Sequence, residues 1–257
     1  MLYLIVSSLS WLSIPVLFWI FRHEEDYRPS LGKKRSLYIL TTVYLAFALF
    51  PLLKGDGGGM SLAFTVLPLL YICVFRRHIR VLFTYFRKNV ILLAVPIFLL
   101  LILEEGFLAL GYRISGFEPY TSLYQVGKHL LSYTGFYIGI TATIIFFHNR
   151  YQFSRWQLFM AGGLWGILVE QEFKGLKMLY AGEFSNLFFY VPIIFLTYGL
   201  YLLWPKVVFS EELKGKIHST RWHVLLLWVV VSIVPIATWL AWSFLLKMAG
   251  IDTGGII

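Results

Sequence analysis

Two adjacent carboxylates, Glu104 and Glu105, stand inside a long apolar run from Val90 to Leu110. If this run is a helix that enters the membrane at its basic end, the pair lies about 24 Å into a hydrocarbon core about 30 Å thick. A carboxylate at that depth costs at least about 2.5 kcal/mol, so we expect the pair to face protein or water rather than lipid. Close carboxylates share a proton, because burial and like charge both favour the neutral form of one of them. This property suits a general base that activates water, or a proton-coupled carrier.

Sequence spacing suggests a partner for the pair. Arg113 follows Glu105 by two helical turns and is therefore expected on nearly the same helix face. Its long side chain is able to reach back toward a carboxylate. Earlier in the run, Pro96 removes a backbone hydrogen bond and predicts a kink.

A second polar group follows the weaker apolar run from Trp156 to about Tyr180. Gly162 and Gly166 form a small-xxx-small pair, which predicts close packing on another helix, and Glu170 and Lys174 continue the same row. Glu170 is expected at nearly the same depth as Glu104. The hypothesis is a pocket near the outer leaflet with candidate catalytic residues Glu104, Glu105, His129 and Glu170 and candidate substrate-binding residues Arg113, Glu172 and Lys174. The alternative is that Glu170 already lies outside the bilayer and that Glu104 and Glu105 pair with Arg113 only for packing.

A metal or cofactor is not indicated by these residues. Cys73 is the only cysteine and His129 the only histidine expected on the outer side, so the pocket has few metal ligands. No Gly-rich phosphate-binding loop is present in the sequence, and no cofactor is identified.

The elements that position these residues are predicted to be membrane-spanning helices. Hydrophobic residues make up 59% of the 257 residues and charged residues 14%, which is more apolar surface than one soluble core buries. Runs near the required length of about 17 to 25 residues are Leu2 to Phe21, Leu37 to Leu53, Met60 to Phe75, Val90 to Leu110, Leu130 to Phe147, Trp156 to about Tyr180, Leu187 to Trp204 and Trp222 to Leu246. The expected fold class is an all-α polytopic membrane helical bundle with about eight transmembrane helices, forming a single integral membrane domain over residues 1–257.

The distribution of basic residues supports the two weakest runs, which are the short one from Met60 to Phe75 and the partly charged one from Trp156 to about Tyr180. With eight spans, alternate loops hold 16 of the 22 Lys and Arg residues, as expected for cytoplasmic loops. Dropping either weak run scrambles this alternation. The N-terminus and the C-terminus are therefore both expected outside, and the membrane is expected to be a plasma or inner membrane.

The loops also indicate partners. A segment of mixed basic and aromatic residues joins two spans and is expected to lie against anionic lipid through Arg76, Arg77, Arg80, Arg87 and Lys88. Nucleic acid is not an expected partner, because the basic residues sit in short separate loops rather than on one continuous face.

The stretch Leu103-Glu104-Glu105 to Arg113 resembles the intramembrane glutamate proteases of the CAAX-processing and bacteriocin-processing group. The resemblance covers eleven residues and implies a membrane-embedded peptidase with one of the glutamates as base. In that family the arginine follows the pair by four positions, whereas Arg113 follows Glu105 by eight. The family's Phe-xxx-His and His-xxx-Asn motifs are absent, since His148 is followed at that spacing by Gln152. Membership is not inferred.

Three functions are compatible with these features. The first is an enzyme that acts at the outer leaflet on a peptide or lipid-linked substrate, and the second is a proton- or ion-coupled transporter. The third is a scaffold or assembly subunit of a larger membrane complex, whose charges only hold helices together.

Overall fold

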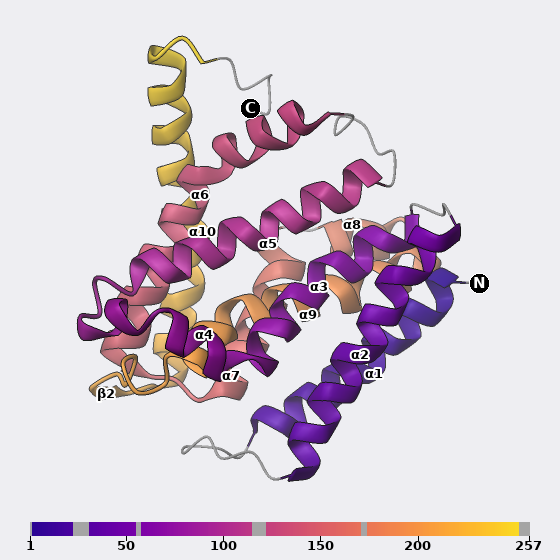
Figure 1. Ribbon diagram of the computed structural model, residues 1–257, viewed down its shortest axis with the longest axis horizontal. Coiled ribbons are helices and arrows are strands. Elements are labelled where there is room, and N and C mark those ends of the chain that lie inside the picture. Colours follow the sequence, from indigo (N-terminus) through magenta and orange to yellow (C-terminus); the bar gives the residue numbers. More distant parts are fainter. Residues whose placement is uncertain (1, 23–30, 55–57, 115–121, 171–173, 252–257) are drawn as a thin grey trace.

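The computed structural model describes residues 2–22, 31–54, 58–114, 122–170 and 174–251. Figure 1 shows a bundle of helices joined by short connections. The long helices are α1 (Leu2–Phe21), α2 (Leu31–Lys54), α3 (Gly58–Val74), α5 (Ala94–Ile114), α6 (Leu123–Arg150), α7 (Arg155–Trp165), α9 (Phe184–Val208) and α10 (Arg221–Met248). The short ones are α4 (Arg76–Leu82), the 3-10 helix η1 (Thr84–Lys88), the π-helix η2 (Gly166–Glu170) and α8 (Lys174–Tyr180).

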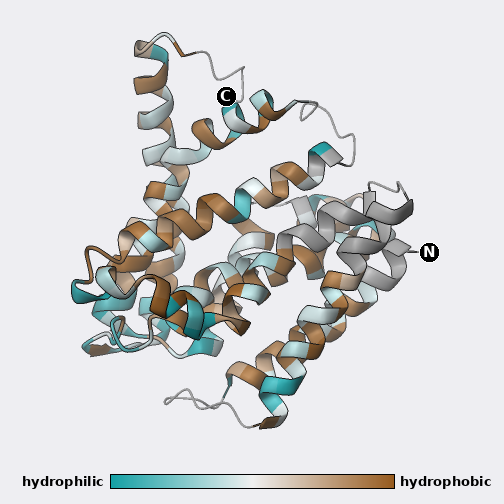
Figure 2. Cartoon of the chain, in the orientation of Figure 1, coloured by the Kyte–Doolittle hydropathy of each residue, from teal (hydrophilic) through white to brown (hydrophobic). Residues whose placement is uncertain are grey.

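Helices follow the apolar runs, and the all-α prediction is confirmed. The described strands are β1 (Tyr151–Gln152) and β2 (Ile217–His218), which pair in parallel over two residues each. Among the described residues, four stretches are long and apolar enough to cross a membrane. They are Ala94–Gly111, Leu123–Arg150, Phe184–Val208 and Arg221–Met248, and Ser7–Phe21 is a shorter apolar helix. Figure 2 shows hydrophobic residues along these helices and hydrophilic residues gathered around α4 and β2.

Two predicted runs differ from the observed helices. The run from Trp156 to Tyr180 is not one regular helix, because α7 gives way to η2 at Gly166 and α8 begins only at Lys174. Glycine is a poor helix former, and several glycines precede this change. The helix that carries Glu104 begins at Ala94, so Pro96 lies in its first turn. A proline there needs no intrahelical partner for its nitrogen, so the predicted mid-helix kink has no basis.

Glycine contacts determine how closely the helices approach. In α7, a Cβ on Gly162 would lie 2.9 Å from the carbonyl carbon of Tyr198 and 3.1 Å from Cα of Gly199 on α9. Gly166 faces the Tyr198 side chain, where a Cβ would lie 2.6 Å from Cγ. The small-xxx-small pair therefore packs on another helix as predicted. Gly139 of α6 approaches Pro235 of α10 in the same manner.

The chain around β2 is fastened to the end of α6. The backbone N–H of Gly215 donates to His148 O at 3.1 Å, and that of Lys216 donates to Arg150 O at 3.0 Å. A Cβ on Gly215 would lie 2.6 Å from the Gln152 nitrogen, so only glycine fits this approach. The loop after α9 is thereby held beside β1.

Ion pairs hold the same loop to α4 and η1. Arg80 binds Glu211 and Glu212, and Arg87 Nε donates to Glu212 Oε1 at 2.5 Å. Two of the five basic side chains predicted to contact anionic lipid thus have carboxylate partners within the protein. Lipid contact through the segment from Arg76 to Lys88 remains a prediction.

Candidate functional site

Glu105 is the centre of a buried hydrogen-bonded group formed by α5 and α6. Its Oε1 lies 2.5 Å from His129 Nε2, and the Tyr137 hydroxyl donates to its Oε2 at 2.5 Å. Glu105, His129 and Tyr137 are 8%, 8% and 4% exposed. Because α5 and α6 are both apolar spans, this group lies inside a non-polar bundle, where each contact is worth more than in water. We call these three residues the Glu105 cluster.

Local structure explains how α6 presents its two members of the cluster. The helix begins with a capping box, in which the Ser122 hydroxyl accepts from the Gln125 N–H and the Gln125 side chain accepts from the Ser122 N–H. His129 and Tyr137 are eight residues apart and so lie on one face, two turns apart. The Tyr133 ring packs 4.5 Å from the His129 ring.

The other two predicted residues on α5 behave differently from each other. Glu104 is 3% exposed and close enough to Tyr137 to interact with it electrostatically, so it lies near the cluster. Arg113 is exposed, and within the described part of the chain no ion pair joins it to Glu104 or Glu105. The partners of Glu105 are therefore His129 and Tyr137 rather than Arg113.

Three predicted residues fall at the edge of what is described. Glu170 is the last residue of η2 and Lys174 the first of α8, but their side chains lie outside the described residues, as does all of Glu172. Their place in the pocket stays a prediction.

Tyr137 is a member of the cluster that the sequence reasoning missed. The signal was available, because Tyr137 follows His129 by the same eight residues that suggested Arg113 as a partner of Glu105. A tyrosine in an apolar span is usually read as a packing residue, since its ring is large and its hydroxyl uncharged.

Buried polar side chains continue from the cluster along α6 and α9. The Tyr201 ring of α9 lies 6.4 Å from the Tyr137 ring, and Tyr201 is 3% exposed. The buried hydroxyls of Thr141 and Thr197 have no hydrogen-bond partner within the described residues.

The series ends at the other end of α6, with His148. This side chain is 1% exposed, neither ring nitrogen has a hydrogen-bond partner in the described part of the chain, and Lys206 of α9 is near enough to repel its charged form. The rise along α6 from His129 to His148 is about 28 Å, close to the hydrocarbon thickness of about 30 Å.

Carboxylate and imidazole at hydrogen-bond distance are able to hold one proton between them. In one state the protonated imidazole donates to the carboxylate, and in the other the carboxylic acid donates to the neutral imidazole. Within the described residues, no group of three or more His, Cys, Asp or Glu is placed to hold a metal ion. The contact between Glu105 and His129 therefore allows the cluster to bind a proton. No known protein family, curated protein or solved structure matches this chain.

Proposed function

We propose that the protein crosses a plasma or inner membrane about eight times, with both termini outside the cytoplasm. Two observations support this threading. Seven of the eight predicted apolar runs lie largely within one helix each, and the described residues of the run from Trp156 to Tyr180 lie in α7, η2 and α8. One cavity also brings together the end of α1, the start of α7 and the end of α9, and eight crossings put all three on one side.

Cysteine labelling tests the threading. In a Cys73→Ser background, Ser210→Cys tests the loop after α9, and Gly182→Cys tests the connection between α8 and α9. We expect a membrane-impermeant maleimide to label position 182 from outside in intact cells and position 210 only after the membrane is opened. Labelling of both positions from the same side would contradict the proposal.

We infer further that the Glu105 cluster is the proton-binding site of a proton-coupled carrier. The observation that carries this inference is the series of buried polar side chains, which extends over nearly the whole hydrocarbon thickness. Ionisable and polar groups at such depth are costly and typically line ion or proton pathways. A structural ion pair needs only one level of the bundle, whereas buried polar side chains recur along α6 from the Glu105 cluster to His148.

Electrostatics explains what a proton does at this site. With Glu105 ionised and His129 neutral, the pair carries one negative charge in a low-dielectric environment. One bound proton makes the pair neutral and replaces a buried charge by a strong internal hydrogen bond. A carrier uses this difference, because the neutral site changes its exposure between the two faces at lower cost than the charged one.

Proton flux in vesicles tests the carrier function. Purified protein is reconstituted in liposomes with a pH-sensitive dye inside, and anions, cations, sugars and amino acids are screened for solute-driven proton uptake. We expect at least one solute to drive uptake in the wild type, Glu105→Gln to abolish it, and Glu183→Gln, a change at an exposed glutamate, to preserve it. Flux through Glu105→Gln equal to that of the wild type would contradict the assignment.

A membrane-embedded enzyme is the second candidate. It is favoured by the contact between Glu105 and His129, since a general base is commonly oriented by such a pair. An enzyme predicts turnover of a peptide or lipid-linked substrate that Glu105→Gln abolishes, with no solute-driven proton flux in the wild type. A scaffold instead predicts that Glu105, His129 and Tyr137 tolerate joint replacement by apolar residues without functional loss.

A further inference from the structure

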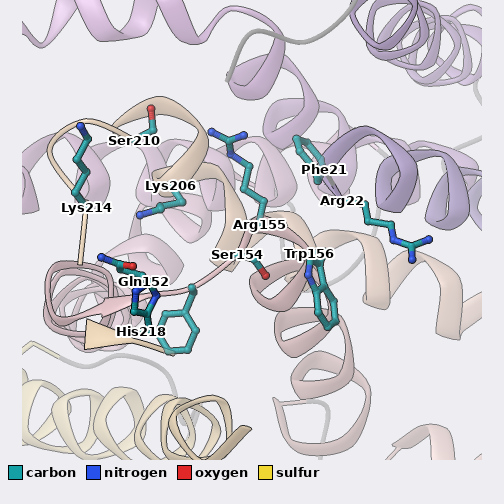
Figure 3. A pocket seen from close by; sticks show the side chains of 11 residues that line it. Phe21, Arg22, Gln152, Ser154, Arg155, Trp156, Lys206, Ser210, Lys214 and His218 are labelled. Atoms are coloured by element: carbon teal, nitrogen blue, oxygen red, sulfur yellow. The ribbon is translucent and has the colours of Figure 1, made fainter. Parts of the chain in front are cut away.

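A cavity of about 790 Å³ opens at the end of the bundle opposite the Glu105 cluster. Its walls come from the end of α1, the start of α7, the end of α9 and the loop that contains β2. Figure 3 shows Lys206 extending into it beside Gln152, with Arg155 nearby and Arg22 at the far edge. The charged and titratable residues that line it are Arg22, Arg155, Lys206, Lys214 and His218. We call it the basic cavity.

The cavity concentrates positive charge without acidic residues of its own. None of the described residues that line it is acidic. Lys206 is close enough to Arg155 and Lys214 to be repelled by both. The two carboxylates that precede Lys214 in the sequence, Glu211 and Glu212, form ion pairs with Arg80 and Arg87. Several cations at short range repel one another, and an anion between them removes that repulsion.

Two of these cations, Arg155 and Lys206, are held in place by the fold. Arg155 is only 5% exposed, although a guanidinium is almost never buried without a reason. The Lys206 ammonium donates to the Leu213 carbonyl, which ties α9 to the loop that follows it. The close contact of Gly215 with β1 positions the backbone of the neighbouring Lys214. The pairing of β2 with β1 places His218 opposite Gln152.

The start of α7 adds to the same field. Ser154 caps this eleven-residue helix, and both Ser154 and Arg155 line the cavity. The first turn of a helix carries partial positive charge, which favours an anion there. Trp156 provides an aromatic wall next to this turn.

We propose that the basic cavity binds a phosphate-bearing anion, held by Arg155 and Lys206 at its centre and by Lys214 at its rim. Arginine and lysine together with a helix start are the groups that recognise phosphate in proteins. The phosphate belongs either to a phospholipid headgroup or to a small soluble compound, since both present the same oxygens. This site is separate from the Glu105 cluster and does not rest on the carrier function.

The neighbouring surface distinguishes the two sources. An apolar groove of about 380 Å³ lies between α7 and α10 and shares Trp156 with the basic cavity. If the phosphate belongs to a phospholipid, its acyl chain has this groove beside it. Met160 lines the groove but not the cavity, so Met160→Trp fills the groove and leaves the cations in place.

Binding measurements on the purified full chain test the proposal. Titration calorimetry with inorganic phosphate in detergent measures the soluble arm. Native mass spectrometry of protein from nanodiscs that contain phosphatidylglycerol measures the lipid arm. We expect at least one of the two probes to bind, and Lys206→Gln and Lys214→Gln each to weaken that binding about tenfold, the usual effect of losing one charge-assisted contact. Lys177→Gln, at an exposed lysine of α8, is the matched control and leaves binding unchanged.

The results distinguish a soluble phosphate ligand, a bound phospholipid and the absence of a site. Phosphate binding that Lys214→Gln weakens, with no retained phospholipid, supports the site and identifies a soluble ligand. Retained phospholipid that Met160→Trp and Lys214→Gln both release supports the site and identifies a lipid. The proposal is overturned if neither probe binds, or if Lys177→Gln weakens binding as much as Lys214→Gln. Lys214 is exposed, so its variant tests the site even if a Lys206 variant fails to fold.

Discussion

Replacement of Gly162 by alanine tests how α7 packs on α9. The added Cβ would lie 2.9 Å from the Tyr198 carbonyl carbon and 3.1 Å from Cα of Gly199, whereas carbon atoms in contact are normally about 3.5 to 4.0 Å apart. The neighbouring atoms belong to backbone, so the helices must separate rather than a side chain rotate. Overpacking of this kind costs about 1–3 kcal/mol, and alanine recovers about 0.5–1 kcal/mol through its better helix propensity. We expect a net loss of about 1–2 kcal/mol in the free energy of unfolding.

Gly127 provides the matched control on α6. A Cβ at this position meets no atom within 4 Å, so Gly127→Ala keeps only the propensity gain and is expected to stabilise the protein by about 0.5–1 kcal/mol. Both variants are unfolded by SDS titration in mixed micelles, with helix content followed by circular dichroism. Equal stability of Gly162→Ala and Gly127→Ala would refute the packing of α7 on α9.

Three further outcomes are expected. Gly215→Ala places a Cβ 2.6 Å from the Gln152 nitrogen, so we expect it to lower the free energy of unfolding by about 1–3 kcal/mol in the same SDS titration and to weaken any anion binding in the basic cavity. The hydrogen bond from Arg80 holds the pKa of Glu211 below its ordinary value of 4.5, so its stabilising contribution is complete above that value and is lost as pH falls through the lower folded pKa. The stability advantage of the wild type over Glu211→Gln should therefore vanish in acid, and an advantage independent of pH would exclude the ion pair. Cys73 is fully buried, so a maleimide should label it only after denaturation, and rapid labelling of the native protein would place it elsewhere.

Hydrophobic runs predicted where the helices lie, because a chain in lipid must satisfy its backbone hydrogen bonds within each segment. The glycine row from Gly162 to Gly166 predicted a helix contact for a similar reason, since only small residues allow backbones to approach so closely. Both predictions need only the residues of a single segment, without knowledge of its neighbours in the fold. The break in the helix after Trp165 was not predicted, because a π-helix has no clear local sequence signal.

The Glu105 cluster was predicted only in part. Depth along a helix follows from residue count, so Glu105 and His129 were expected at compatible levels. Rotation about the helix axis depends on packing between helices, so the sequence did not distinguish Arg113 from Tyr137 as a partner. An exposed arginine and a buried tyrosine are the outcome of that packing.

The basic cavity was not predicted, although its residues were counted. Arg22, Arg155, Lys206 and Lys214 come from three loops, which were assigned to the cytoplasmic side by their basic residues alone. Their convergence depends on the tertiary contacts of α1, α7 and α9, and in particular on the attachment of the loop after α9 to β1. No spacing in the sequence reports that attachment.

The most direct measurement for the proposed function is the titration of Glu105 itself within the membrane. Infrared difference spectra of the reconstituted protein, recorded as pH is varied, report each carboxyl group that takes up or releases a proton. A proton-binding site at Glu105 predicts a carboxyl band that titrates in the wild type, disappears in Glu105→Gln, shifts in Tyr137→Phe through loss of its hydrogen bond, and persists in Glu183→Gln. A spectrum in which Glu105→Gln removes no titrating band would contradict a proton-binding site at the Glu105 cluster.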